Sequence, residues 1–170
     1  MSGLEQQVVE HIPRLRRYAR ALLRGDALAA DDLVQDCLER ALGRMHRWRR
    51  GSDLRAWLFT IMHNLYVNQV RRAANGPRFV DWPEPDDASG AAADADIGLA
   101  LRDLERALAA LSPDQREIVL LVSLEGLRYQ QVAAILGIPE GTVMSRLSRA
   151  REQLRAALTQ GRPNTLWRVK

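Results

Sequence analysis

Arginine and hydroxyl side chains gather near the end of the 170-residue chain, in the stretch GIPEGTVMSRLSRARE (137–152). A helix N-terminus offers free N–H groups to a backbone phosphate, and the forked arginine side chain matches both phosphate and guanine. A helix starting at about residue 139 would present these groups from its first turns. The candidate DNA contacts are Thr142, Met144, Ser145, Arg146, Ser148, Arg149 and Arg151.

The segment YQQVAAIL (129–136) supplies the partner helix that such a DNA-reading helix needs. Ala133 is small enough for two helices to cross closely, and Gly137 stands where the turn requires a left-handed backbone. The inward faces would carry Val132, Leu136, Ile138, Val143 and Leu147. This pattern favours a helix-turn-helix over an ordinary helical hairpin, which remains the alternative.

A second group of polar side chains lies on the helix predicted over residues 29–47. Asp32, Gln35, Asp36 and Glu39 are spaced i, i+3, i+4 and i+7, so they share one face opposite an apolar stripe. Three acids and an amide are clustered inside an otherwise basic domain, which favours a functional face. A solvated helix surface is the alternative.

Seven helices and an acidic segment are expected to position these groups. Apolar residues recur every three or four positions in 8–22, 29–47 and 53–73, and after the acidic segment in 97–111, 113–125, 129–136 and 139–158. No stretch alternates like a β-strand. We therefore expect an all-α protein of two small helical domains, a three-helix domain over residues 1–75 and a four-helix domain over 99–160, with a tail at 161–170.

Residues 76–98 are expected to form a flexible acidic linker. They carry six acids and one arginine, whereas residues 1–75 carry 13 arginines against 8 acids. Pro83 and Pro85 disfavour a helix there, and the Ala/Asp/Gly stretch lacks core-forming side chains. Phe79, Val80 and Trp82 are the apolar exceptions, as are Leu166 and Trp167 in the tail.

Composition excludes several classes of protein. The single cysteine, Cys37, cannot form an internal disulfide and is expected to be a buried thiol. His11, His46 and His63 lack metal-ligand spacing, and neither a catalytic constellation nor a phosphate loop is present. We therefore expect no metal, no cofactor and no enzymatic activity. The chain also lacks a signal peptide and an apolar run long enough to span a membrane, which points to the cytoplasm.

Three segments resemble extracytoplasmic-function (ECF) sigma factors of bacterial RNA polymerase. GIPEGTVMSRLSRAREQLR resembles their region 4 reading helix, ADDLVQDCLERAL their polymerase-binding segment, and LRAWLFTIMHNLYVNQVRR their promoter-melting segment. The motifs occur in the family's order, and the resemblance covers about residues 8–160. It implies a sigma region 2 domain over 1–75 and a sigma region 4 domain over 99–160, in an alternative sigma factor that directs promoter recognition and transcription initiation.

The resemblance also implies partners and roles. The face formed by Asp32, Leu33, Gln35, Asp36 and Glu39 would bind core polymerase at the clamp of the largest subunit, with a further contact to the flap of the second subunit. The C-terminal helix-turn-helix would read the −35 promoter element, and an anti-sigma factor is expected as a further partner. The −10 element would be opened by Arg47, Trp48, Arg49, Arg50, Trp57, Asn64, Arg71 and Arg72.

Strand opening requires cations for the backbone and a pocket for a flipped base, which these residue types could supply. Asn64 would hydrogen-bond that base. Trp48 is expected to be the exposed aromatic, whereas Trp57 is equally consistent with a core position.

The chain departs from the family pattern at Met144, Ser148 and Arg128. The first two leave the −35 sequence preference open. Arg128 replaces the usual serine or threonine cap of the first helix of the motif, so we expect a slightly frayed start there, with Gln131 unable to complete a capping box.

Two other classes of protein are alternatives to the sigma factor. A stand-alone helix-turn-helix regulator would leave the acidic face and Asn64 unexplained. A sigma-mimicking partner protein would normally carry a receiver domain, and none is expected in these 170 residues.

Overall fold

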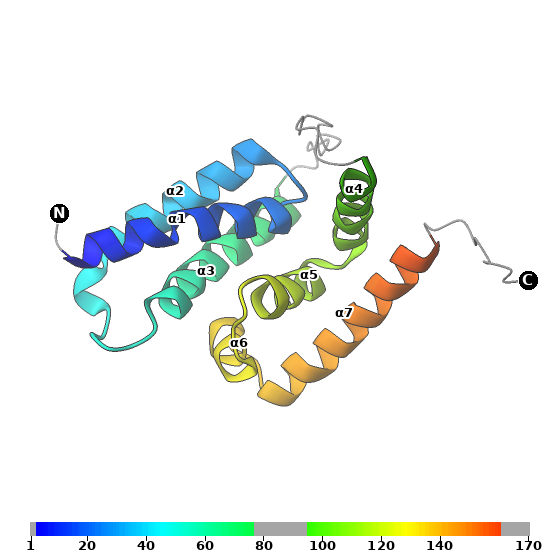
Figure 1. Ribbon diagram of the computed structural model, residues 1–170. Helices are drawn as coiled ribbons and strands as arrows, with labels where there is room; N and C mark the ends of the chain where they lie inside the picture. The colour runs from blue at the N-terminus through cyan, green and yellow to red at the C-terminus, as the bar shows by residue number, and fades with distance from the viewer. Residues whose placement is uncertain (1–2, 77–94, 161–170) are drawn as a thin grey trace, which may run out of the picture.

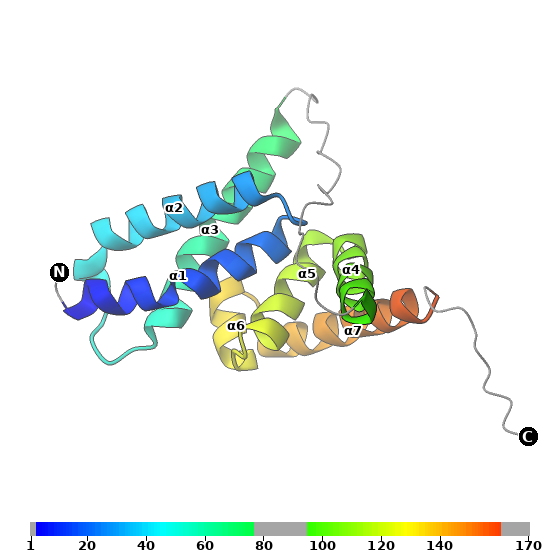
Figure 2. The same ribbon diagram turned by 45° about the horizontal axis from the view of Figure 1, so that its top comes forward.

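The computed structural model describes residues 3–76 and 95–160, and these residues form helices without any β-strand (Figures 1 and 2). The N-terminal unit consists of α1 (Gly3–Leu22), α2 (Ala27–Gly43), the 3₁₀ turn η1 (Met45–Arg47) and α3 (Leu54–Asn75). Helix α2 packs against both α1 and α3. The expected all-α fold is confirmed.

Aspartate caps fix where two of these helices begin. The Asp26 carboxylate accepts the Ala29 N–H at 3.0 Å at the start of α2, and Asp53 accepts the Ala56 N–H at 3.2 Å at the start of α3. These bonds satisfy N–H groups that have no partner within the helix. The helix expected over residues 29–47 ends earlier, at Gly43, and its last turn is the separate turn η1.

The C-terminal unit consists of α4 (Ala95–Ala110), α5 (Pro113–Val119), the π turn η2 (Leu120–Leu124), α6 (Tyr129–Leu136) and α7 (Glu140–Gln160). Ser112 and Gln115 form the expected capping box at the start of α5, with bonds of 3.3 Å in each direction. Helix α7 packs against α4, α5 and α6 on the side away from the N-terminal unit (Figure 2).

Two predicted segments lie largely outside the described residues. These are the acidic linker, of which 77–94 are not described, and the tail at 161–170. They include Phe79, Val80, Trp82, Leu166 and Trp167. Helix α4 already begins at Ala95, within the segment expected to be linker.

The two units share one apolar core. Tyr18 of α1 meets Phe59 of α3 edge-on, with ring centroids 4.9 Å apart. The same cluster continues into the C-terminal unit through Ile118, Leu121 and Val132, all fully buried. Helix α6 packs against α3, while α5 and η2 pack against α1. Burial of apolar surface therefore holds the units together as well as stabilising each one.

Polar side chains cross this shared core at three points. The buried Arg116 of α5 donates to the Leu22 carbonyl at the end of α1, at 3.1 Å. His63 Nδ1 on α3 lies 2.6 Å from Glu117 Oε1 on α5. The third crossing is Glu125, which is buried after η2 and approached by Arg17 at 3.5 Å. We call these three crossings the polar seam.

Candidate nucleic-acid interface

Helices α6 and α7 form the expected helix-turn-helix. Gly137 ends α6 with φ of 65°, a left-handed backbone that favours glycine, and its N–H donates to the Ala133 carbonyl. Val132 of α6 and Val143 and Leu147 of α7 are fully buried between the helices. The turn and the apolar contacts thus fix the angle at which α7 leaves the body of the protein.

The first turns of α7 face outward. Met144, Ser145, Ser148, Arg149 and Arg151 are exposed, and Thr142 is half-buried. Arg146 is also half-buried, because its guanidinium turns toward Asp114 on α5 at 3.9 Å. Six of the seven predicted DNA contacts are therefore available to a ligand, while Arg146 would have to leave Asp114 to reach one.

Gln131 ties the start of α6 more firmly than the sequence suggested. Its side-chain oxygen accepts the Arg128 N–H at 3.0 Å, so one half of a capping box does form. The other half cannot form, because an arginine side chain has no acceptor. The amide of Gln131 also donates to Asp53 of the N-terminal unit at 2.8 Å. Gln131 therefore supplies one half of the cap without completing a capping box with Arg128, as the sequence predicted.

A row of polar side chains runs along α3. Asn64 is exposed, and Asn68, Arg71 and Asn75 follow at spacings of four, three and four, so all lie on one face. Arg71 and Arg72 were expected from the sequence, whereas Asn68 and Asn75 were not. The spacing that begins at Asn64 is the signal that could have found them.

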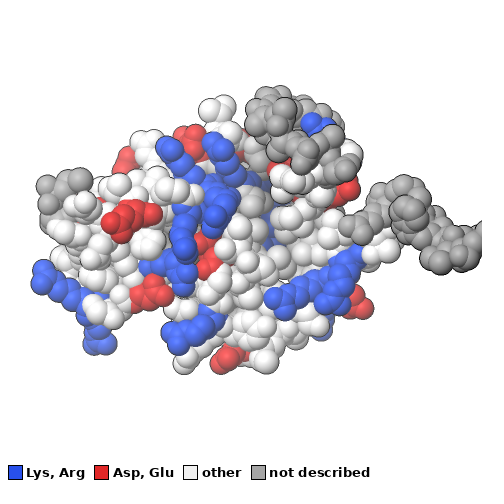
Figure 3. Space-filling view, in the orientation of Figure 1, with Lys and Arg blue, Asp and Glu red and all other residues white. Residues whose placement is uncertain are grey.

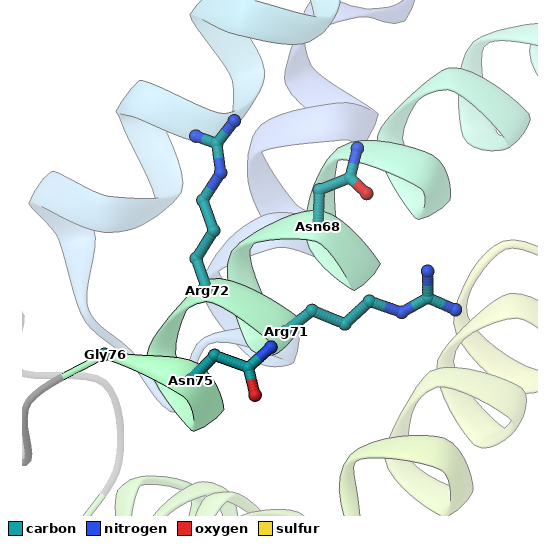
Figure 4. A pocket seen from close by; sticks show the side chains of 5 residues that line it. All are labelled: Asn68, Arg71, Arg72, Asn75 and Gly76. Atoms are coloured by element: carbon teal, nitrogen blue, oxygen red, sulfur yellow. The ribbon is translucent and has the colours of Figure 1, made fainter.

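This row ends in a hollow of about 460 Å³ at the C-terminal end of α3, lined by Asn68, Arg71, Arg72, Asn75 and Gly76 (Figure 4). The two guanidinium groups point away from each other, with the two amides beside them. Arginine can bind phosphate and asparagine can pair with adenine, so the end of α3 has the donors that duplex DNA requires.

The connection between α2 and α3 supplies further cations. Arg47, Arg49 and Arg50 are all exposed, and the Ser52 hydroxyl donates to the Arg49 carbonyl at 2.7 Å. Trp48 is not the exposed aromatic that the sequence suggested. It is half-buried against the core, and its indole Nε1 is buried without a hydrogen-bond partner in the described part of the chain. Trp57 is also half-buried, so neither tryptophan stands out as a stacking surface.

The acidic face of α2 is present with one correction. Asp32, Gln35, Asp36 and Glu39 are exposed, and Gln35 donates to Glu39 at 3.2 Å. Leu33, which we had placed on this surface, is fully buried and belongs to the core. Two leucines that were not predicted extend the same face, since Leu28 is 82% and Leu42 50% exposed.

Basic side chains gather in separate places on the surface. In the space-filling view one band crosses α1 and another group lies along α7 (Figure 3). Helix α1 contributes Arg14, Arg16, Arg17 and Arg20, all exposed. The band on α1 was not among the predicted DNA contacts.

Comparisons with known proteins agree with this architecture. Residues 8–63 match the family described as the sigma2 domain of PhyR, and residues 101–154 match sigma-70 region 4. The ECF RNA polymerase sigma factor EcfG of Rhodopseudomonas palustris is 38% identical over 163 residues, covering 92% of this chain and 85% of the relative. SigC of Mycobacterium tuberculosis is 35% identical over 131 residues, covering 77% of this chain and 71% of the relative.

A solved structure is similar over nearly the whole chain. The sigma factor RpoE of Bartonella quintana, solved in complex with the anti-sigma factor NepR, has a TM-score of 0.78 and 35% sequence identity. The match covers 95% of this chain and all of that one.

A sigma2-type N-terminal unit followed by a region 4 helix-turn-helix defines a bacterial transcription initiation factor. The chain belongs to the ECF RNA polymerase sigma factors. It binds core RNA polymerase and promoter DNA and directs promoter-specific transcription initiation. This membership sets aside the stand-alone regulator. Among the described helices, none is long and apolar enough to cross a membrane.

Proposed function

We propose that the two units divide the work of initiation. The N-terminal unit, within residues 1–75, binds the polymerase clamp and opens the −10 element. The C-terminal unit, within 99–160, reads the −35 element and contacts the polymerase flap. The chain acts in the cytoplasm, as a binding factor without catalytic chemistry of its own.

The observation that carries this proposal is the separation of three exposed polar surfaces on three helices. The acids of α2, the amide and arginine row of α3 and the outward face of α7 differ in charge and residue type. An acidic face suits a basic protein surface, whereas guanidinium groups suit phosphates and base edges. Each surface therefore fits one ligand of a sigma factor.

An anti-sigma partner is proposed from similarity. The RpoE structure of Bartonella quintana is a complex with NepR, and this chain is 35% identical to that RpoE. We propose a NepR-like anti-sigma factor as a regulator of this chain as well.

Transcription with purified core polymerase on a library of genomic promoter fragments tests the proposal. The chain should direct run-off transcripts from a subset of promoters that share two sequence elements. Asp36→Arg should reduce holoenzyme formation tenfold or more, because it places a cation on the acidic face of α2. Glu10→Gln is the control, because it removes an exposed acid of α1 that lies outside this face. Unchanged core binding by Asp36→Arg would refute the role of that face.

Two further substitutions separate the DNA surfaces. Arg149→Ala should weaken binding to the −35 element by about 1–3 kcal/mol if the guanidinium pairs with a base. Asn64→Ala should leave −35 binding unchanged and slow strand opening, measured by permanganate reactivity of unpaired thymines. The proposed division fails if both variants lose the same step.

A further inference from the structure

A hollow with an apolar wall lies beside the exposed cations of α7. It has a volume of about 490 Å³ and is formed where the first residue of α6 meets the flank of α7. Among its lining residues, Leu147 is fully buried and Tyr129 is half-buried, whereas Met144 and Ser148 are exposed. The helix proposed to read DNA therefore presents an unfilled apolar surface next to its polar side chains.

Met144 determines the chemistry of this hollow. Its side chain is 52% exposed, although it is large and apolar. The thioether has no hydrogen-bond donor and is only a weak acceptor, so it cannot pair with the polar edge of a base as arginine does. Ser148, one turn later on α7, is too short to fill the space beside it. A flexible apolar side chain next to unfilled space suits an apolar group of a ligand.

The charged residues of the hollow limit what that ligand can be. Arg151 and Arg155 lie seven and eleven residues after Met144, which places all three on one face of α7. Glu152 also lines the hollow and repels a phosphate placed next to it. The two guanidinium groups therefore form the side that binds an anion. An apolar wall beside two cations fits a ligand that carries a hydrocarbon group close to a phosphate.

Thymine in duplex DNA has both of these properties. Its C5-methyl group is the apolar group that a base pair presents in the major groove, and apolar side chains recognise it by contact. Arginine side chains bind the phosphates of the backbone to which the base is attached. An apolar side chain of a protein partner is the other occupant that such a hollow admits. Met144 lies next to Ser145 and within two turns of Arg149, both exposed candidate DNA contacts, and this position favours a base.

We propose that Met144 reads the C5-methyl group of a thymine in the −35 element, in the hollow that Tyr129 and Ser148 help to form. Arg151 and Arg155 hold the phosphate backbone beside that base. The inference rests on the proposed role of α7 in reading the −35 element. It adds a base preference at the positions where the chain departs from the family pattern.

Removing single methyl groups from the promoter tests this inference in the holoenzyme. Each thymine of the −35 element, on either strand, would be replaced in turn by deoxyuridine, which pairs in the same way and lacks only the C5-methyl group. Competition against a fluorescently labelled promoter fragment measures the affinity of each duplex. At one position the replacement should weaken binding about fourfold, the effect of burying one methyl group.

Substitutions at Met144 assign the effect to this side chain. Met144→Ala should weaken binding to the thymine promoter by a similar factor and abolish the difference between thymine and deoxyuridine. Met144→Leu keeps an apolar side chain of similar volume and should retain the difference. Val9→Ala is the control, because Val9 lies on α1 and is similarly exposed, at 48%. A methyl effect that persists unchanged in Met144→Ala would overturn the proposal.

Scrambling the whole −35 element separates this inference from the function on which it rests. If scrambling leaves binding unchanged, α7 does not read that element, and the proposed function of the C-terminal unit fails together with the inference. If scrambling weakens binding but no single deoxyuridine does, only thymine reading is overturned, and a protein side chain becomes the better occupant of the hollow. A −35 element without any A·T pair would overturn thymine reading as well.

Discussion

At the scale of single residues, Cys37 shows how strongly the N-terminal core excludes water. The thiol is fully buried and lies 3.5 Å from the Leu58 carbonyl, and burial raises its pKa to about 12. We expect Ellman's reagent at pH 8 to modify Cys37 slowly in the native chain and at once in denaturant. Because the raised pKa favours the thiol in the folded state, its contribution to stability should be complete below about pH 9 and lost as the pH rises toward 12. Immediate native labelling would show that the core opens readily.

At the scale of elements, α2 and α3 are both capped by an aspartate, so substitutions of the two caps can be compared directly. Asp26 and Asp53 each accept an N–H of the helix they begin, but only Asp53 also accepts from Gln131 across the units. Asp26→Ala should cost about 0.5–2 kcal/mol of unfolding free energy. Asp53→Ala should cost more, since it also breaks the bond to Gln131. Urea denaturation measures both, and equal losses would mean that the Asp53–Gln131 bond contributes nothing to stability.

Protonation of the Asp53 carboxylate should also lower the free energy of unfolding. Burial opposes the shift, but the hydrogen bonds from Ala56 and Gln131 hold its pKa below the ordinary value. The stability it contributes is therefore present above about pH 4 and lost as the pH falls through the lowered pKa.

Two glycines in or next to the turn of the helix-turn-helix, Gly137 and Gly141, can be compared in the same way. Gly137 has φ of 65°, whereas Gly141 lies in the first turn of α7, and a Cβ at either position would meet nothing within 4 Å. Gly137→Ala should therefore destabilise by about 1–2 kcal/mol through backbone strain alone. Gly141→Ala should stabilise by about 0.4–1 kcal/mol, because alanine loses less entropy in a helix. Thermal unfolding followed by circular dichroism checks both signs.

At the scale of the whole molecule, the shared core should make the two units unfold together. We expect one calorimetric transition whose enthalpy equals the van't Hoff value. His63→Ala removes one of the three crossings of the polar seam and leaves Glu117 buried without that partner, so the two units should unfold less cooperatively and the transition should broaden. Two transitions in the unchanged chain would show that each unit is stable without the other.

The sequence predicted those features that are encoded within a few neighbouring residues. The capping box at Ser112, the left-handed Gly137 and the order of the helices depend on local spacing, and the structure confirms them. The seam could not be predicted in this way, because His63 and Glu117 are 54 residues apart and Arg116 is 94 residues from Leu22. Leu33 was misplaced for a related reason: it adjoins the acids in sequence but faces inward on the helix.

The position of Arg116 also bears on how the chain is made. The ribosome synthesises α1, α2 and α3 before α5. During that interval the Leu22 carbonyl and the side chains of Tyr18 and His63 lack their partners from α5. A wholly apolar surface exposed during that interval would promote aggregation. Hydroxyl, imidazole and carbonyl groups can bond to water instead. The polar groups of the seam can therefore be hydrated in a half-synthesised chain, whereas the apolar side chains that pack across the two units cannot.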